Sequence, residues 1–122
     1  MNTLCTIHGH SAAKVERVIK EMRDLGAPTI RVVDCGEYLV ALEGVHRLEA
    51  AARLGIVPTL AILDQDAPVT ADSLDWQDLR SGETYTAGEL AAEAYSVGSG
   101  IYRLDGDGTL TLVRNGHHIP QD

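Results

Sequence analysis

The sequence predicts a fold of the α/β (α+β) class, with helices around a small sheet in its first half and an acidic helix and β-hairpin in its second half. Two observations carry this prediction. Up to residue 63, segments with the apolar spacing of helices alternate with short β-type runs. Beyond residue 63 the composition becomes acidic and loop-like. We therefore expect a core over residues 1–63 and an extension over residues 64–122 that packs on it as part of one structural domain.

A helix is predicted over residues 11–25, because its apolar side chains recur at intervals of three and four residues. Ser11 is a suitable N-cap, and Gly26 followed by Pro28 is a typical helix end. One face of this helix is therefore expected to be buried, and the other face to meet solvent.

The next segments predict a hairpin, a second helix and a third strand. Two short β-type runs, residues 29–34 and 38–42, are separated by a turn that contains glycine. Strong helix formers follow from Val45 and stop at Gly55, and residues 57–63 resemble a strand again. The expected order is helix, strand, strand, helix, strand.

The extension is expected to begin with a surface loop over residues 64–78, with one short helical turn near residues 73–79. Thr86 and Glu89 have the spacing of a capping box, which predicts a helix through residue 94 or 95. Two strands, residues 101–104 and 109–113, flank an Asp-Gly-Asp-Gly sequence. We interpret that sequence as a hairpin turn, because a calcium loop would need further acidic ligands.

The net charge of −8 is confined to the second half of the chain. Residues 1–63 hold seven basic and seven acidic side chains, whereas residues 64–122 hold three basic and eleven acidic ones. An acidic chain is repelled by polyanions, so we expect no DNA binding and no association with anionic membranes. The sequence contains no apolar run of membrane-spanning length and begins without the pattern of a signal peptide, so we expect a cytoplasmic protein. Cys5 and Cys35 are then expected to be reduced thiols.

The stretch Glu43, Gly44, Val45, His46, Arg47 carries the most chemistry, because it lies where a strand gives way to a helix. Backbone N–H groups at a helix N-terminus attract anions, a glycine permits close approach, and an arginine can bind phosphate through two donors. His46 could donate to the same phosphate, and Glu43 could hold magnesium or accept a proton. The same residues fit a purely structural turn equally well, with Glu43 and Arg47 as an ion pair and His46 as a capping or core residue.

The pattern Glu-Gly-x-His-Arg-x-x-Ala-Ala, with a short helix ending at glycine and a strand beginning Val-Pro-Thr-Leu, resembles the ParB/sulfiredoxin superfamily (the ParB-like nuclease and nucleotide-binding domain). The resemblance covers about residues 11–63. It implies a compact nucleotide-binding domain with a small mixed sheet, in which Gly44, Val45, His46 and Arg47 hold the phosphates of ATP, ADP or CTP, with magnesium in many members. It also implies that Glu43 assists magnesium or a hydroxyl substrate.

Within the superfamily, the residues separate the known activities. Sulfiredoxins place a reactive cysteine at the position of Val45, so sulfinic-acid reduction is not expected here. The chain also lacks the basic box and the DNA-binding region of partition proteins. The motif is closest to that of the free-serine kinases, whose catalytic glutamate would have to be Glu16 or Glu21. Magnesium-dependent nucleotide hydrolysis or phosphoryl transfer is the leading hypothesis, with Glu43 and His46 as the candidate catalytic residues. Whether the chain is an enzyme stays open.

A hypothesis of another class is a non-catalytic adaptor or regulatory protein, which would use its acidic segment, residues 64–78, to bind a protein partner. The absence of an evident nucleophile favours this alternative. Two weaker features are interpreted as structural: His8 and His10 lack a third metal ligand nearby, and Trp76 is expected to anchor its loop on the core.

Overall fold

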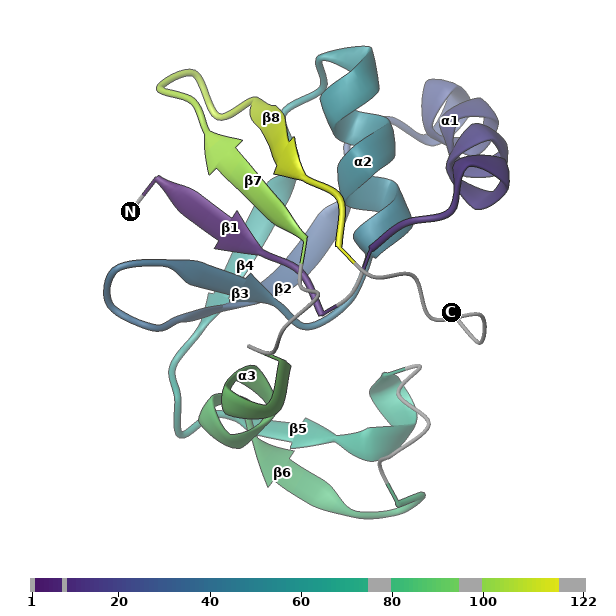
Figure 1. The fold of residues 1–122 in the computed structure, drawn as a ribbon. Helices are drawn as coiled ribbons and strands as arrows, with labels where there is room; N and C mark the ends of the chain where they lie inside the picture. Colours follow the sequence, from purple (N-terminus) through teal and green to yellow (C-terminus); the bar gives the residue numbers. More distant parts are fainter. Residues whose placement is uncertain (1, 8, 75–79, 95–99, 117–122) are drawn as a thin grey trace.

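Figure 1 shows a central sheet with two helices, α1 and α2, on one side, and a smaller lobe of α3, β5 and β6 beside it. The computed structural model describes residues 2–7, 9–74, 80–94 and 100–116. In chain order its elements are β1 (Thr3–Cys5), α1 (Ala12–Leu25), β2 (Thr29–Asp34), β3 (Leu39–Ala41), α2 (Val45–Leu54), β4 (Thr59–Leu63), β5 (Pro68–Thr70), a 3₁₀ turn η1 (Ala71–Ser73), β6 (Thr84–Thr86), α3 (Ala87–Ala94), β7 (Ile101–Leu104) and β8 (Leu110–Arg114).

The main sheet has six strands in the order β4-β2-β3-β1-β7-β8. β1 runs parallel to β3, and β2 runs parallel to β4, whereas the other neighbouring strands are antiparallel. The sheet is therefore mixed, and the predicted combination of helices with a mixed sheet is confirmed. β5 and β6 pair with each other in a separate antiparallel sheet.

Both faces of the main sheet are covered, because successive side chains of a strand point to opposite sides. In β1, Leu4 belongs to a buried cluster with Leu48 of α2, and Cys5 belongs to a different cluster with Leu90 of α3. β2, β3, β4 and β7 divide their side chains between the same two clusters. α2 thus covers one face, and the lobe of α3 and β5 covers the other (Figure 1).

The two long helices begin and end where the sequence predicts. The Ser11 hydroxyl accepts a hydrogen bond from the backbone N–H of Lys14 at 3.3 Å, so Ser11 caps α1. α1 ends at Gly26 and α2 ends at Gly55, both with positive φ. α1 packs on α2 through Met22, which forms a small cluster with two alanines of α2.

Three short strands were not predicted, and one prediction needs correction. β1, β5 and β6 each have three residues, too few to show an alternating pattern. The surface loop predicted over residues 64–78 is interrupted by β5 and by a 3₁₀ turn at Ala71–Ser73. The helical turn predicted near residues 73–79 falls mostly on residues 75–79, which lie outside the described residues. Trp76 lies outside the described residues, so its predicted anchoring role stays a prediction.

The predicted C-terminal hairpin is present, and it continues the main sheet. β7 pairs with β1, with Tyr102 opposite Leu4. In the turn, Asp107 accepts hydrogen bonds from the backbone and hydroxyl of Thr109, and Asp105 accepts one from the Thr111 hydroxyl. The aspartates therefore stabilise the hairpin turn. Among the helices of the described ranges, none combines the length and the apolar content needed to cross a membrane.

Candidate functional site

The turn between β3 and α2 is built around Gly44, which adopts the left-handed conformation with φ 74° and ψ 30°. A Cβ atom at this position would clash with Cδ1 of Ile30 and would lie 3.2 Å from the Arg47 guanidinium. Only glycine fits both the backbone conformation and the space. The first helical hydrogen bond of α2 runs from the backbone N–H of Leu48 to the Gly44 carbonyl at 2.8 Å. Residues 45–47 therefore form the first turn of α2, whose N–H groups have no partner within the helix.

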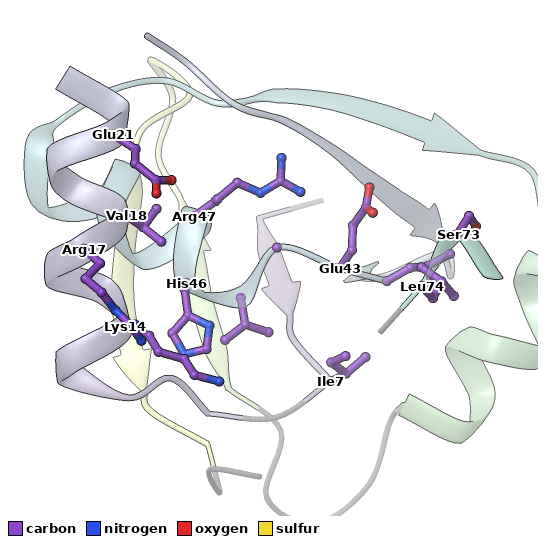
Figure 2. Close-up of a pocket in the computed structure, with 13 residues that line it drawn as sticks. Ile7, Lys14, Arg17, Val18, Glu21, Glu43, His46, Arg47, Ser73 and Leu74 are labelled. Atoms are coloured by element: carbon purple, nitrogen blue, oxygen red, sulfur yellow. The ribbon is translucent and has the colours of Figure 1, made fainter. Parts of the chain in front are cut away.

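A cavity of about 530 Å³ opens over this turn. Figure 2 shows α1 as one wall, the turn as the floor, and the segment that follows β5 at the opposite side. The lining residues come from four separate parts of the chain: Ile7; Lys14, Arg17, Val18 and Glu21; Leu42, Glu43, Gly44, Val45, His46 and Arg47; Ser73 and Leu74. The structure thus brings all five residues of the motif to one cavity.

The wall of the cavity formed by α1 and α2 is cationic. Lys14 and Arg17 reach it from α1, and Arg47 reaches it from the first turn of α2 (Figure 2). The Arg47 guanidinium makes one long hydrogen bond, 3.5 Å to the Thr29 carbonyl, and within the described residues it forms no ion pair. Glu21 is the carboxylate on this wall. Three cations therefore face one acid there, and a helix N-terminus adds to the positive potential.

Glu43 pairs with Arg31, not with Arg47, which corrects the structural interpretation of the motif. The Arg31 side chain donates from Nε to Oε2 at 2.9 Å and from Nη2 to Oε1 at 2.8 Å, and its backbone N–H also donates to Oε2 at 3.3 Å. This two-pronged pairing holds the pKa of Glu43 below its ordinary value. Arg47 is left with its positive charge directed at the cavity.

The carboxylate of Glu43 is therefore poorly placed as a resident magnesium ligand. A metal ion at Glu43 would have to compete with the Arg31 guanidinium for the same two oxygens. In the ranges that the structure describes, no group of three or more His, Cys, Asp or Glu side chains is arranged to hold a metal ion. His8 lies outside these ranges, and His10 is buried beside Glu49, with 3.9 Å between Nδ1 and Oε1.

His46 connects the two helices at the cavity. Its Nε2 accepts a hydrogen bond from the backbone N–H of Ser11, the N-cap of α1, at 3.1 Å. A ring nitrogen that accepts carries no proton, so the neutral ring has its proton on Nδ1. This hydrogen bond ties the first turn of α2 to the start of α1.

Val45 and the cysteines are not reactive groups of this cavity. The Val45 side chain is 3% exposed, so only its backbone can reach an anion. Cys5 and Cys35 pack in the hydrophobic cluster that also contains Leu42 and Leu74, but neither cysteine lines the cavity. Burial is the main cause of their raised thiol pKa values. Of the two glutamates considered on the first helix, Glu21 lines the cavity and Glu16 does not.

Four functional candidates escaped the sequence analysis: Lys14, Arg17, Arg31 and Leu74. Lys14, Arg17 and Glu21 follow each other at spacings of three and four, so a polar stripe along α1 was visible in the sequence. Arg31 and Leu74 had no such signal, because their positions depend on strand pairing and on the packing of the small lobe.

The described acidic side chains of the acidic segment are exposed, although Val69, Ala71 and Leu74 between and beside them are buried. Asp64, Asp66 and Asp72 lie at the surface, and Asp72 accepts hydrogen bonds from the Ser81 hydroxyl and the backbone N–H of Gly82. Asp75 and Asp78 lie outside the described residues. Binding of a protein partner through residues 64–78 stays a prediction.

Comparison of the chain with protein-family models, with curated proteins and with solved structures gave no match.

Proposed function

We propose that the cavity binds a nucleotide through its phosphates, at residues 44–47. The observation that carries this proposal is the convergence of Lys14, Arg17 and Arg47 on a glycine turn that begins a helix. A cavity of about 530 Å³ is also within the usual size of small-molecule sites, roughly 300–1,000 Å³. The resemblance of the motif to the ParB/sulfiredoxin superfamily supports the same ligand class, ATP, ADP or CTP.

The phosphates are proposed to lie against the first turn of α2. The backbone N–H groups of residues 45–47 donate to the terminal phosphate, and the Arg47 fork binds two of its oxygens. Lys14 and Arg17 neutralise further charge from the facing wall. Magnesium, when it accompanies the phosphates, adds positive charge there.

The reaction that this arrangement supports best is nucleotide hydrolysis or phosphoryl transfer. Such reactions depend on positioning and on cations around the transferred group, more than on covalent chemistry by the protein. Glu43 can orient the attacking hydroxyl or water, and His46 lines the cavity beside the proposed position of the phosphate. These roles require no nucleophilic side chain in the cavity.

Isothermal titration with ATP, ADP and CTP, in the presence of magnesium, tests the proposal. Arg47→Ala is expected to lower the affinity at least about tenfold, because hydrogen bonds to charged groups contribute about 1.5–3 kcal/mol. Arg23→Ala is the matched control, since Arg23 is exposed on α1 and does not line the cavity. Absence of binding by the wild-type chain to all three nucleotides would refute the proposal.

A further inference from the structure

The cavity has a second end that differs in chemistry from the cationic wall. Beyond Glu43 it is lined by Ile7 and Leu74, together with Ser73 (Figure 2). Leu42 is fully buried and Leu74 is 8% exposed, and both belong to the hydrophobic cluster against which Ile7 packs. This end of the cavity, called the apolar end below, is therefore a fixed apolar surface.

Arg31 fixes the apolar end in place. The same guanidinium that pairs with Glu43 donates from Nη1 to the Ser73 hydroxyl at 3.1 Å and from Nη2 to the Ser73 carbonyl at 2.9 Å. The Ser73 hydroxyl in turn donates to the Thr70 carbonyl at 2.7 Å. Strand β2 thus holds the segment after β5 at the edge of the cavity, and Leu74 with it.

The apolar end does not suit a charged ligand. Among the residues that the structure describes, its charged groups are Glu43, which lines it, and Arg31, which neutralises Glu43. A second phosphate or carboxylate would meet the Glu43 carboxylate without a spare cation, and an ammonium group would have to displace Arg31. The aliphatic side chains of Ile7 and Leu74 instead favour an uncharged group with an apolar body.

Glu43 lies between the two ends and has capacity left for one more donor. In the contacts of the described residues, its Oε1 accepts one hydrogen bond, from Arg31, whereas a carboxylate oxygen can accept two. The Glu43 side chain is 23% exposed and lines the cavity. A hydroxyl group entering from the apolar end can therefore donate to Oε1 while its oxygen faces the cationic wall.

We propose that the apolar end binds a small uncharged alcohol with an apolar body, which accepts the phosphoryl group of the nucleotide held at the cationic wall. This inference rests on the proposed function. The alcohol oxygen forms a bond to the terminal phosphorus, and the bond from that phosphorus to the bridging oxygen breaks. The nucleoside diphosphate leaves with the electron pair, and the hydroxyl proton passes to Glu43 and then to water. The products are an alkyl phosphate and a nucleoside diphosphate.

The test is a partition experiment on the full chain, with ATP, magnesium and either 1-butanol or glycerol at equal concentration. Phosphorus NMR measures the alkyl phosphate formed relative to inorganic phosphate. The amount of butyl phosphate formed, relative to inorganic phosphate, is expected to exceed that of glycerol phosphate, because only butanol has an apolar body that fits the apolar end. In Leu74→Ala this preference is expected to fall about tenfold, the scale of discrimination that a few methylene contacts provide.

Leu74→Val removes less side-chain volume. It replaces Leu74→Ala in the test if Leu74→Ala does not fold. Leu25→Ala is the matched control, because Leu25 is 82% exposed and does not line the main cavity. Titration with ATP and with inorganic tripolyphosphate runs in parallel. Both affinities are expected to stay within about twofold in the Leu74 variants, since no contact to the nucleotide is removed.

The outcomes separate the two proposals. If the wild-type chain does not bind ATP, the proposed function fails, and the acceptor site fails with it. If ATP binds but no alkyl phosphate forms, or the preference is unchanged in both Leu74 variants, the acceptor site alone is overturned. The acceptor site is also overturned if the Leu74 variants lower the affinity for ATP but not the affinity for tripolyphosphate. The apolar end would then hold the base of the nucleotide.

Discussion

The Tyr102 hydroxyl donates a hydrogen bond to Oε1 of Glu49 at 2.7 Å, and both side chains are almost completely buried. Tyr102 belongs to β7, and Glu49 belongs to α2. Arg53, one turn further along α2, donates to the other Glu49 oxygen at 2.7 Å. The C-terminal hairpin is thereby joined to the helix whose first turn forms the candidate phosphate site.

Replacing Tyr102 by phenylalanine is expected to lower the free energy of unfolding by about 1–2 kcal/mol, because Glu49 stays buried with one donor fewer. Urea denaturation monitored by circular dichroism measures the change. Tyr85→Phe is the control, since its hydroxyl contacts Glu83 at the surface. Equal stabilities of the two variants would show that the buried hydrogen bond contributes nothing.

Gly44→Ala is expected to destabilise the fold more than Gly55→Ala. Both glycines have positive φ, but a Cβ at Gly55 has no atom within 4 Å, whereas one at Gly44 meets Ile30. We expect about 1 kcal/mol for the backbone strain at Gly55, and roughly 2–4 kcal/mol at Gly44, where overpacking is added. Thermal and urea unfolding of the two variants compare these effects. If the two variants lose similar amounts of unfolding free energy, the Ile30 side chain moves away from the new Cβ at little energetic cost.

The pair of Arg31 and Glu43 makes stability depend on pH in the acid range. The pKa of Glu43 is lowered in the folded chain from its ordinary value of 4.5, so the folded state prefers the ionised carboxylate. The stability from this preference is present above that ordinary value and is lost as the pH falls through the lowered pKa. Wild type is therefore expected to be more stable than Glu43→Gln at about pH 7. This difference in the free energy of unfolding is expected to narrow as the pH falls below the ordinary pKa of Glu43.

Glu37→Gln provides the control for this measurement, because Glu37 is exposed between β2 and β3. Urea unfolding at a series of pH values is run on all three proteins. A difference between wild type and Glu43→Gln that is constant over the whole range would contradict a role for ionisation of this pair.

Local signals predicted much of the fold. The N-cap Ser11, the glycines that end α1 and α2, and the capping box of Thr86 and Glu89 were all visible in the sequence, because each acts on residues within one or two turns. Three short strands were missed. The pairing of β1 with β3 and β7 joins residues that are far apart in the chain. A strand of three residues is too short to predict such a pairing.

The candidate site was predicted to a similar extent. The motif of residues 43–47 was found because its chemistry is contiguous. The structural alternative paired Glu43 with Arg47, which is closer in sequence, whereas the antiparallel pairing of β2 and β3 brings Arg31 to Glu43. Leu74 and Ser73 join the cavity only through the folding of the small lobe, so they carried no local signal.

The place of β1 in the sheet has a consequence for how the chain folds during synthesis. One edge of β1 pairs with β3, which is synthesised soon after it. The other edge pairs with β7, which is synthesised much later, with Leu4 opposite Tyr102. Until the last fifth of the chain has left the ribosome, β1 presents an open strand edge that other chains can join. Contacts of such long sequence separation also slow folding. Aggregation is therefore expected to be most severe for nascent chains that stall before residue 101.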